Sequence, residues 1–383
     1  MPQAPSAATR SVPMVDLKGQ YAHIADKIDR AVLEVIRSTQ YIKGPYVQRF
    51  EEELASYLAC ERVIGCANGT DALQIAMMAL ELKPGDEVIV PSFTYVATAE
   101  VIALLGLTPV MVDVDPDTFN VRAEDVAPAI TARTKAIVPV HLFGQSCDME
   151  ELLALAKAHK LYVVEDNAQA IGADYTFSDG STAKTGTLGD VGCTSFFPSK
   201  NLGAYGDGGA MFTNDQPLAA KLARVANHGQ DRQYYHDVVG VNSRLDALQA
   251  AILSVKLRYL DEYSHARRAA ATYYDEAFES IAALQTPVRS NRSTHVFHQY
   301  SLRVLDGSRD ALRERLREAG IAHNVYYPVP LYRQGAFAKT VPDGFSLPNT
   351  ELLCAQVLAL PMHTELTESD LAYIADVVRS HFE

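Results

Sequence analysis

Lys200 has neighbours in the sequence that point to a chemical role for its amine. It lies within residues 194–203, on an expected tight turn between two strand-like apolar stretches, beside phenylalanines, a proline and a glycine. Loss of hydration disfavours the charged ammonium form, and a lysine whose pKa falls becomes a neutral amine that can attack a carbonyl carbon and form a Schiff base. The alternative is a surface lysine whose stem packs on Phe196 or Phe197 while its charged head stays in water.

A second candidate site is the sequence Ala-Asn-Gly-Thr-Asp at residues 67–71, directly before an apolar helical pattern. Gly69 and Thr70 at a helix start leave backbone N–H groups free and add a hydroxyl, and the helix dipole favours an anion there. A phosphate could therefore bind at this point. The alternative is an ordinary helix cap without a ligand.

A third candidate is the acidic pair Glu165 and Asp166, which ends a strand-like run and is followed by Gln169. In open α/β sheets, ligands bind beyond the carboxyl ends of the strands. Adjacent strand residues face opposite sides, so one carboxylate should point into the site and the other toward a neighbouring layer. A carboxylate facing a pyridine nitrogen would keep that nitrogen protonated, whereas the alternative role for Asp166 is a helix cap.

Other side chains could complete such a site. Ser195 adds a hydroxyl five residues before Lys200, and Tyr95 follows another strand, where its ring could stack on a planar cofactor or simply fill the core. Arg232 and Arg244 flank glycine-rich and asparagine-containing turns and could pair with a phosphate or a carboxylate, although solvated surface charge is the usual role of an arginine.

These residues must be positioned by a regular framework, and the middle of the chain alternates short β-rich runs with helical patterns. This alternation is typical of βαβ units and a mostly parallel sheet. Strands are predicted at residues 87–90, 109–113, 136–140 and 161–165. Helices are predicted at residues 71–82, 97–105, 123–130 and 149–159.

The character of the sequence changes near Arg244, where one long helical stretch over residues 245–280 begins. We expect a large domain at residues 1–245 and a smaller C-terminal α+β domain at residues 246–383 that includes this helix. Within the second domain, strands are predicted at residues 295–304 and 322–327, and a helix at residues 310–319. A final helix should open at a cap formed by Thr367 and Asp370.

The composition excludes several classes of protein. A net charge of −13 argues against general nucleic-acid affinity, which needs clustered lysines and arginines. Five scattered cysteines and the histidine spacing indicate neither a disulfide framework nor a metal site. The N-terminus lacks the apolar core of a signal peptide and no apolar run spans a membrane, so a soluble cytoplasmic protein is expected.

A phosphate-binding turn, a strand-end aspartate, a hydroxyl and a lysine occur in this order in one predicted α/β domain, and together they match the needs of pyridoxal 5′-phosphate. At this point the sequence resembles the DegT/DnrJ/EryC1/StrS family of nucleotide-sugar aminotransferases, which have the aspartate aminotransferase fold (fold type I). The resemblance covers Val15 to His363, nearly the whole chain. Its most specific motifs lie at residues 68–73, 85–94, 165–169, 195–203 and 240–246.

The resemblance implies a seven-stranded sheet between helices and a role for each candidate residue. Lys200 would hold the cofactor as a Schiff base and move the proton on the substrate carbon, while Asp166 would pair with the pyridine nitrogen. Tyr95 would stack on the cofactor ring and Gln169 would lie near its other face. The phosphate would be held by Gly69, Thr70 and Ser195, with Asn242 supplied by the other subunit of a homodimer.

The resemblance also implies a reaction, in which L-glutamate donates an amino group to a nucleotide-linked keto-sugar. Some motifs are most similar to those of enzymes that aminate a UDP-linked 3-oxo-N-acetylhexosaminuronate, where an arginine at the position of Arg244 can meet a carboxylate. Arg232 is a further candidate for the substrate, and Tyr326 stands where the family commonly has a histidine. The product would serve surface polysaccharide synthesis, including lipopolysaccharide.

Three alternatives remain open at this point. The substrate could be a dTDP-linked 3-oxo-6-deoxyhexose. The chain could be a sugar dehydratase of the same family, although those enzymes carry histidine where this chain has Lys200. It could also be a non-catalytic regulatory protein of the same fold, for which retention of Lys200, Asp166 and Ser195 has no purpose.

Overall fold

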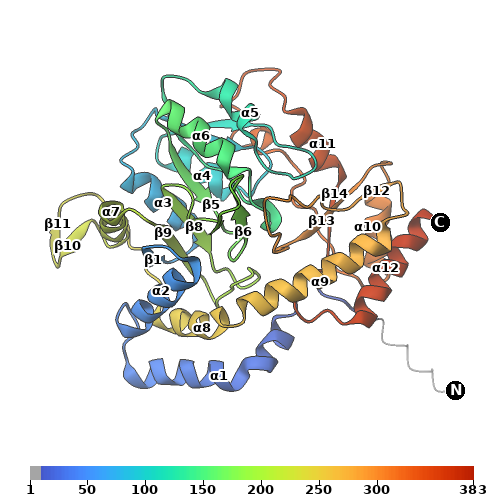
Figure 1. The fold of residues 1–383 in the computed structure, drawn as a ribbon, viewed down its shortest axis with the longest axis horizontal. Helices are drawn as coiled ribbons and strands as arrows, with labels where there is room; N and C mark the ends of the chain where they lie inside the picture. Colours follow the sequence, from blue (N-terminus) through green and yellow to red (C-terminus); the bar gives the residue numbers. More distant parts are fainter. Residues whose placement is uncertain (1–9) are drawn as a thin grey trace.

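A seven-stranded sheet forms the centre of the computed structural model, which describes residues 10–383 (Figure 1). The expectation about a signal peptide concerns the first residues, most of which lie outside this range. Only one strand of the sheet, β9, runs antiparallel to the others. The strands, in their order across the sheet, are β1 (Arg62–Cys66), β9 (Gly209–Thr213), β8 (Val191–Ser195), β5 (Tyr162–Asp166), β4 (Thr134–Ile137), β2 (Glu87–Pro91) and β3 (Thr108–Val112).

Helices cover both faces of this sheet, because successive residues of each buried strand are apolar on both sides. Val163 of β5 packs into one layer and the next residue, Val164, packs into the other. One layer contains α3 (Gly69–Ala79), α4 (Ala97–Leu104) and α7 (Gln216–Ala226). The other contains α2 (Pro45–Leu58), α5 (Ala123–Val126), α6 (Met149–His159) and α8 (Ala247–Leu257). The predicted fold class is confirmed.

The predicted strands and helices of this large region are all present, with ends shifted by a few residues. The predicted helix at residues 71–82 begins earlier, at Gly69, because the Asn68 side chain caps the N–H of Asp71. The predicted helix at residues 123–130 consists of α5 and a short 3₁₀ turn, Ala127–Ala129. Two further 3₁₀ turns occupy Leu142–Gly144 and Leu331–Arg333.

The prediction of one continuous helix over residues 245–280 is wrong. The stretch forms α8 and a second helix, α9 (Leu260–Phe278), which are separated at Arg258 and Tyr259. The N–H of Tyr259 bonds back three residues to the carbonyl of Lys256, so the helix tightens and turns there. Figure 1 shows α9 leading away from the central sheet toward the C-terminal elements.

The C-terminal region is built on a small antiparallel sheet and its own apolar cluster. Its elements are β12 (Leu284–Gln285), β13 (Tyr300–Val304), α10 (Arg309–Glu318), α11 (Pro348–Gln356), β14 (Val357–Leu360) and α12 (Glu368–Phe382). The side chains of Thr367 and Asp370 form the expected reciprocal cap of α12. The position of the domain boundary, after residue 245, stays a prediction.

Two strands predicted in this region are wrong in whole or in part. Only residues 300–304 of the predicted strand 295–304 are extended in the sheet, because Phe297 has a left-handed backbone with φ of 44°. Residues 322–327 form no strand and make a single bridge, between Asn324 and Ala359. Both segments pass from the C-terminal region toward the large sheet.

The remaining elements are one helix, α1 (Leu17–Ser38), and two hairpins. The hairpins are formed by β6 (Asp174–Thr176) with β7 (Thr182–Lys184), and by β10 (Gln230–Arg232) with β11 (Tyr235–His236). The β10–β11 hairpin extends beyond α7, away from the sheet (Figure 1). None of the helices between residues 10 and 383 has the length and apolar character needed to cross a membrane.

Candidate active site

The candidate residues gather where the strands end at one edge of the large sheet. Cys66 at the end of β1 pairs with Gly209, and Gly209 pairs with Ser195 at the end of β8. One strand further, Asp166 at the end of β5 pairs with Cys193 of β8. The turn before α3 and the segment that carries Lys200 both leave the sheet at this edge.

Asp166 and its neighbour Glu165 face opposite sides of the sheet, as the alternation of a strand predicts. Asp166 is buried and turns toward α4, where its Oδ2 accepts a hydrogen bond from the Thr98 hydroxyl at 2.8 Å. Its Oδ1 accepts one from the Ala168 N–H at 3.2 Å. No lysine, arginine or histidine among residues 10–383 forms an ion pair with Asp166.

Glu165 is fully buried and forms its hydrogen bonds on the opposite side of the sheet from Asp166. His141 Nε2 lies 2.8 Å from its Oε2, and the Gly186, Leu188 and Gly189 N–H groups donate to its two oxygens at 2.6–2.8 Å. His141 Nδ1 accepts from the Cys147 N–H, which leaves Nε2 as the protonated nitrogen that donates to Glu165. Glu165 therefore ties the loop 186–189 to the end of β5.

Lys200 is half-buried on the loop that follows β8. Its N–H donates to the Phe197 carbonyl at 2.8 Å, and the next residue, Asn201, donates from its side chain to the Val296 carbonyl at 2.9 Å. Burial lowers the pKa of Lys200 to about 8, although the nearby Asp166 carboxylate acts in the opposite direction. The amine thus has the reduced basicity that attack on a carbonyl requires.

The turn between β1 and α3 forms a narrow cradle against the end of β8. A Cβ atom on Gly69 would lie 2.7 Å from the Ser195 Cβ and 3.1 Å from its Cα. The Gly69 and Thr70 N–H groups open α3 and have no acceptor among the described residues. Free amides at a helix start beside a serine hydroxyl suit a phosphate group.

Gln169 and Tyr95 border the same space from two sides. Gln169 is buried, with its Oε1 accepting the Phe143 N–H at 2.8 Å and its Nε2 donating to the Tyr327 hydroxyl at 3.1 Å. The ring centroids of Tyr95 and Tyr327 are 6.4 Å apart. Tyr95 is 57% exposed, so one face of its ring is free to stack on a planar group.

Two of the predicted site residues, Asn242 and Arg232, are exposed in or beside the β10–β11 hairpin. Asn242 is exposed at the foot of the β10–β11 hairpin, while the hydroxyl of the next residue, Ser243, accepts the Ala67 N–H at 3.0 Å. Arg232 lies on the projecting hairpin, where its guanidinium packs over the Tyr235 ring at 4.5 Å. Asn242 and Arg232 therefore face outward from their own chain.

Arg244 and Tyr326 have distinct surroundings. Arg244 is half-buried and makes no ion pair within residues 10–383. It lies near Lys43, and the pKa of that lysine is lowered first by burial and second by the positive charge of Arg244. Tyr326 is half-buried against the apolar cluster of the C-terminal region, with its ring centroid 6.0 Å from that of Tyr327.

The sequence alone does not point to three side chains that border the site. Thr98 and Tyr327 bond to Asp166 and Gln169 from elements that are distant in sequence. His298 is buried, its Nδ1 has no partner among residues 10–383, and burial, followed by the nearby Lys200 and Arg267, holds its pKa well below the usual range. It is therefore a neutral imidazole close to Lys200.

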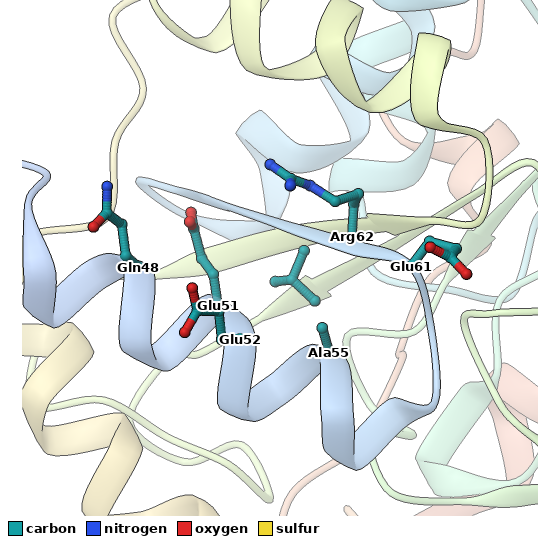
Figure 2. Close-up of a pocket in the computed structure, with 7 residues that line it drawn as sticks. Gln48, Glu51, Glu52, Ala55, Glu61 and Arg62 are labelled. Atoms are coloured by element: carbon teal, nitrogen blue, oxygen red, sulfur yellow. The ribbon is translucent and has the colours of Figure 1, made fainter.

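A surface hollow of about 290 Å³ lies elsewhere, between α2 and β1 (Figure 2). It is lined by Gln48, Glu51, Glu52, Ala55, Glu61, Arg62 and Val63. None of the predicted site residues lines this hollow. Its three carboxylates do not suit an anionic ligand, and one of them, Glu51, accepts the Gly65 N–H at 2.8 Å.

The residues at the strand ends fit pyridoxal 5′-phosphate in three respects. The Gly69 turn packs closely on Ser195 and presents free amides for a phosphate, Asp166 is a buried carboxylate without a cationic partner among residues 10–383, and Lys200 is an amine of lowered pKa. No group of three or more histidine, cysteine or acidic side chains within residues 10–383 is arranged to hold a metal ion.

Comparison with known proteins identifies relatives over almost the whole chain. Residues 22–379 match the DegT/DnrJ/EryC1/StrS aminotransferase family. A protein of Geobacillus stearothermophilus named pleiotropic regulatory protein is 46% identical over 97% of this chain and 99% of its own. The UDP-2-acetamido-2-deoxy-3-oxo-D-glucuronate aminotransferase of Pseudomonas aeruginosa is 46% identical over 95% of this chain and 98% of its own.

Solved structures share the fold. DesV of S. venezuelae, in complex with a ketimine intermediate, has a TM-score of 0.94 and 39% identity, covering 98% of this chain and 99% of that one. NtdA of Bacillus subtilis, with bound pyridoxamine phosphate, has a TM-score of 0.89 and 30% identity, covering 99% of this chain and 86% of that one.

Proposed function

Because the chain belongs to the DegT/DnrJ/EryC1/StrS aminotransferase family, we propose that it transfers an amino group from L-glutamate to the keto group of a nucleotide-linked sugar. The observation that carries this function is Lys200, an amine whose pKa falls to about 8 at the strand-end edge that also holds Asp166 and the Gly69 cradle. Its cofactor is pyridoxal 5′-phosphate, which a solved relative contains in one form, while another solved relative contains the amino form, pyridoxamine phosphate.

The chain's own residues hold this cofactor in the proposal. Gly69, Thr70 and Ser195 bind the phosphate through backbone N–H groups and hydroxyls. Asp166 would pair with the ring nitrogen and keep it protonated. Tyr95 would pack against one face of the ring, and Gln169, which bonds to Phe143 and Tyr327, would lie near the other face.

When bound, pyridoxal 5′-phosphate supplies a carbonyl carbon for the amino group and an electron sink for charge on the substrate carbon. Lys200 would hold the cofactor through its amine. In the reaction it would act as the general base that takes up the proton from the substrate α-carbon, and it would later give a proton to the acceptor carbon. The nearby His298 is uncharged, because its pKa lies well below the usual range, so it adds no positive charge next to Lys200.

We propose that the enzyme is a homodimer whose active sites contain residues of both chains. Asn242 and Arg232 face outward from their own chain, which suits contact with a partner's site. The segment that follows Arg232 exposes the apolar side chains Tyr234, Tyr235 and Val239. A monomer would leave this apolar surface in water, whereas a second copy would cover it.

The proposed acceptor is a UDP-linked 2-acetamido-2-deoxy-3-oxo-hexuronate, as in the name of the Pseudomonas aeruginosa relative. Arg244 supports this choice, because it is a half-buried guanidinium with no carboxylate partner among residues 10–383. Bidentate pairing with a sugar carboxylate would satisfy it. Tyr326 and Arg232 are further candidates for contacts with the sugar or nucleotide.

A dTDP-linked 3-oxo-6-deoxyhexose remains the second candidate substrate, because a relative of Streptomyces venezuelae named for such an activity is 39% identical. A sugar of this class has no carboxylate to pair with Arg244. A purely regulatory role, as in the name of the Geobacillus relative, leaves the lowered pKa of Lys200 without a purpose. We also propose a cytoplasmic location, since the five cysteines are free.

A panel of UDP- and dTDP-linked keto-sugars, generated in coupled reactions with glutamate and read by mass, tests the substrate. We expect amination of the UDP-linked uronate, and Arg244→Ala should raise its KM by about tenfold or more while leaving a neutral 6-deoxy sugar unaffected. Equal losses for both sugars would contradict the role of Arg244. A product that has lost oxygen, formed without consumption of glutamate, would indicate a dehydratase.

A further inference from the structure

We propose that Thr98 is a positioning residue for Asp166, whose carboxylate it holds in the orientation that meets the ring nitrogen of the cofactor. This inference rests on the proposed function, because it assigns Asp166 to that nitrogen. The observation behind it is the 2.8 Å hydrogen bond from the Thr98 hydroxyl to Asp166 Oδ2, between α4 and the end of β5. Thr98 is fully buried.

The backbone of Asp166 is fixed by its neighbours before Thr98 acts. Its N–H donates to the Pro139 carbonyl at 2.9 Å, and its carbonyl accepts the His141 N–H at 3.1 Å. The preceding residue, Glu165, is held by four donors on the other side of the strand. The main freedom left to Asp166 is rotation of its side chain.

Each carboxylate oxygen of Asp166 has one protein donor. Thr98 holds Oδ2, and the Ala168 N–H holds Oδ1 at 3.2 Å. The shorter of the two bonds comes from Thr98. Because a carboxylate oxygen can accept more than one hydrogen bond, lone pairs remain for a cofactor nitrogen.

The environment makes these two donors important for the carboxylate. Asp166 is 6% exposed and forms no ion pair within residues 10–383. A buried polar group is costly unless it is hydrogen-bonded, so the two oxygens depend on the donors that the protein supplies. The Thr98 hydroxyl therefore satisfies Oδ2 and fixes the direction in which the carboxylate points.

The position of Thr98 leaves its hydroxyl available to another element. A threonine in the interior of a helix commonly bonds back to a carbonyl of the preceding turn, but the first turn of a helix has no turn before it. Thr98 is the second residue of α4, and its hydroxyl instead reaches across to a residue 68 positions away in the sequence. This bond joins α4 to the strand-end edge of the sheet.

The test compares Thr98→Val with Thr98→Ser and with a matched control, Thr350→Val. Thr350 is also fully buried and donates from its hydroxyl to an aspartate, Asp113, at 2.8 Å, but it lies at the start of α11. Cofactor is removed from each full-length variant and added back while the absorbance of the bound form is followed. Thermal unfolding of each cofactor-free variant is measured in parallel.

We expect Thr98→Val to weaken cofactor affinity by about tenfold and to change the pH dependence of the bound cofactor's absorbance. Thr98→Ser should retain affinity within about twofold, because its hydroxyl can make the same bond. Thr350→Val should lower the melting temperature and leave both cofactor readouts unchanged.

Two results would have different meanings. If Thr98→Val and Thr350→Val lose similar stability and both keep the wild-type cofactor affinity and spectrum, Thr98 is only structural and the inference is wrong. If the wild-type chain itself takes up no pyridoxal phosphate, the proposed function is wrong instead.

Discussion

Lys200 is subject to two opposing effects that decide its chemistry. Removal of water disfavours the ammonium form and is the larger effect, while the Asp166 carboxylate favours it, with the pKa falling to about 8 as the result. At pH 7 about a tenth of such amines are neutral, compared with about three in ten thousand for an ordinary lysine of pKa 10.5. Burial therefore supplies the nucleophile at neutral pH.

This shift predicts a pH dependence for Lys200 in the cofactor-free protein. A lowered pKa means that the reactive neutral form increases as the pH rises, reaches half of the total at about pH 8 and about nine-tenths one pH unit higher. Reductive methylation, read peptide by peptide by mass, should give a Lys200 rate that levels off near pH 9. Exposed lysines elsewhere in the chain should continue to gain rate toward pH 10.5. A Lys200 rate that rises with theirs would contradict the shift.

At the residue scale, the sequence predicts the site residues that follow strand ends and not those that approach from other elements. Asp166 and Ser195 end β5 and β8, so the order of strands and helices already places them at one edge. Thr98 and Tyr327 bond to site residues that are 68 and 158 positions away. Such contacts depend on how α4 and the 322–327 segment pack, which no local pattern encodes.

The turn from β1 to α3 is the element that should bind the phosphate, and Gly69 allows it to pack closely against Ser195 at the end of β8. Gly69→Ala adds a Cβ that would lie 2.7 Å from the Ser195 Cβ, so the turn or the end of β8 must shift. We expect cofactor affinity to fall by about tenfold or more, because the free amides move from their positions. Titration of the cofactor-free protein with pyridoxal phosphate measures this.

Gly335→Ala is the matched control for this element, since a Cβ at Gly335 meets nothing within 4 Å. It should leave cofactor affinity unchanged. Wild-type affinity in Gly69→Ala would show that the cradle is not the phosphate site.

Local patterns predict the elements of the large sheet better than those of the C-terminal region. The strands β2, β3, β4 and β5 lie where apolar runs predict them, because burial on both faces makes each run continuous. The break between α8 and α9 contains no glycine or proline to signal it. Likewise, Phe297 has a left-handed backbone, which a bulky side chain does not favour. The preceding residue, Val296, donates its N–H to the Gly144 carbonyl.

At the scale of the whole molecule, the proposed homodimer makes each site depend on two chains. Lys200→Ala removes the amine, and Asn242→Asp places a negative charge beside the partner's phosphate, so each variant alone should lose most activity. A hybrid dimer of the two variants contains one intact site, formed by Lys200 of one chain and Asn242 of its partner. Random mixing of equal amounts should restore about a quarter of wild-type activity, because half of the dimers are hybrids.

The mixture is prepared by unfolding and refolding the two variants together, and sedimentation confirms the dimer. Activity no higher than the mean of the separately refolded variants would show that Asn242 does not serve a partner's site. A wild-type chain that sediments as a monomer would remove the basis for shared sites.

The most direct test of the account is the identity of the lysine that holds the cofactor. The wild-type enzyme is loaded with pyridoxal phosphate, reduced with borohydride, digested and analysed by peptide mass. We expect the absorbance of the bound cofactor, at the short-wavelength end of the visible range, to disappear and the added mass to lie on Lys200. Lys200→Ala should show no such label and no transaminase turnover. Label on a different lysine, such as the buried Lys256, or full turnover of Lys200→Ala, would contradict the account.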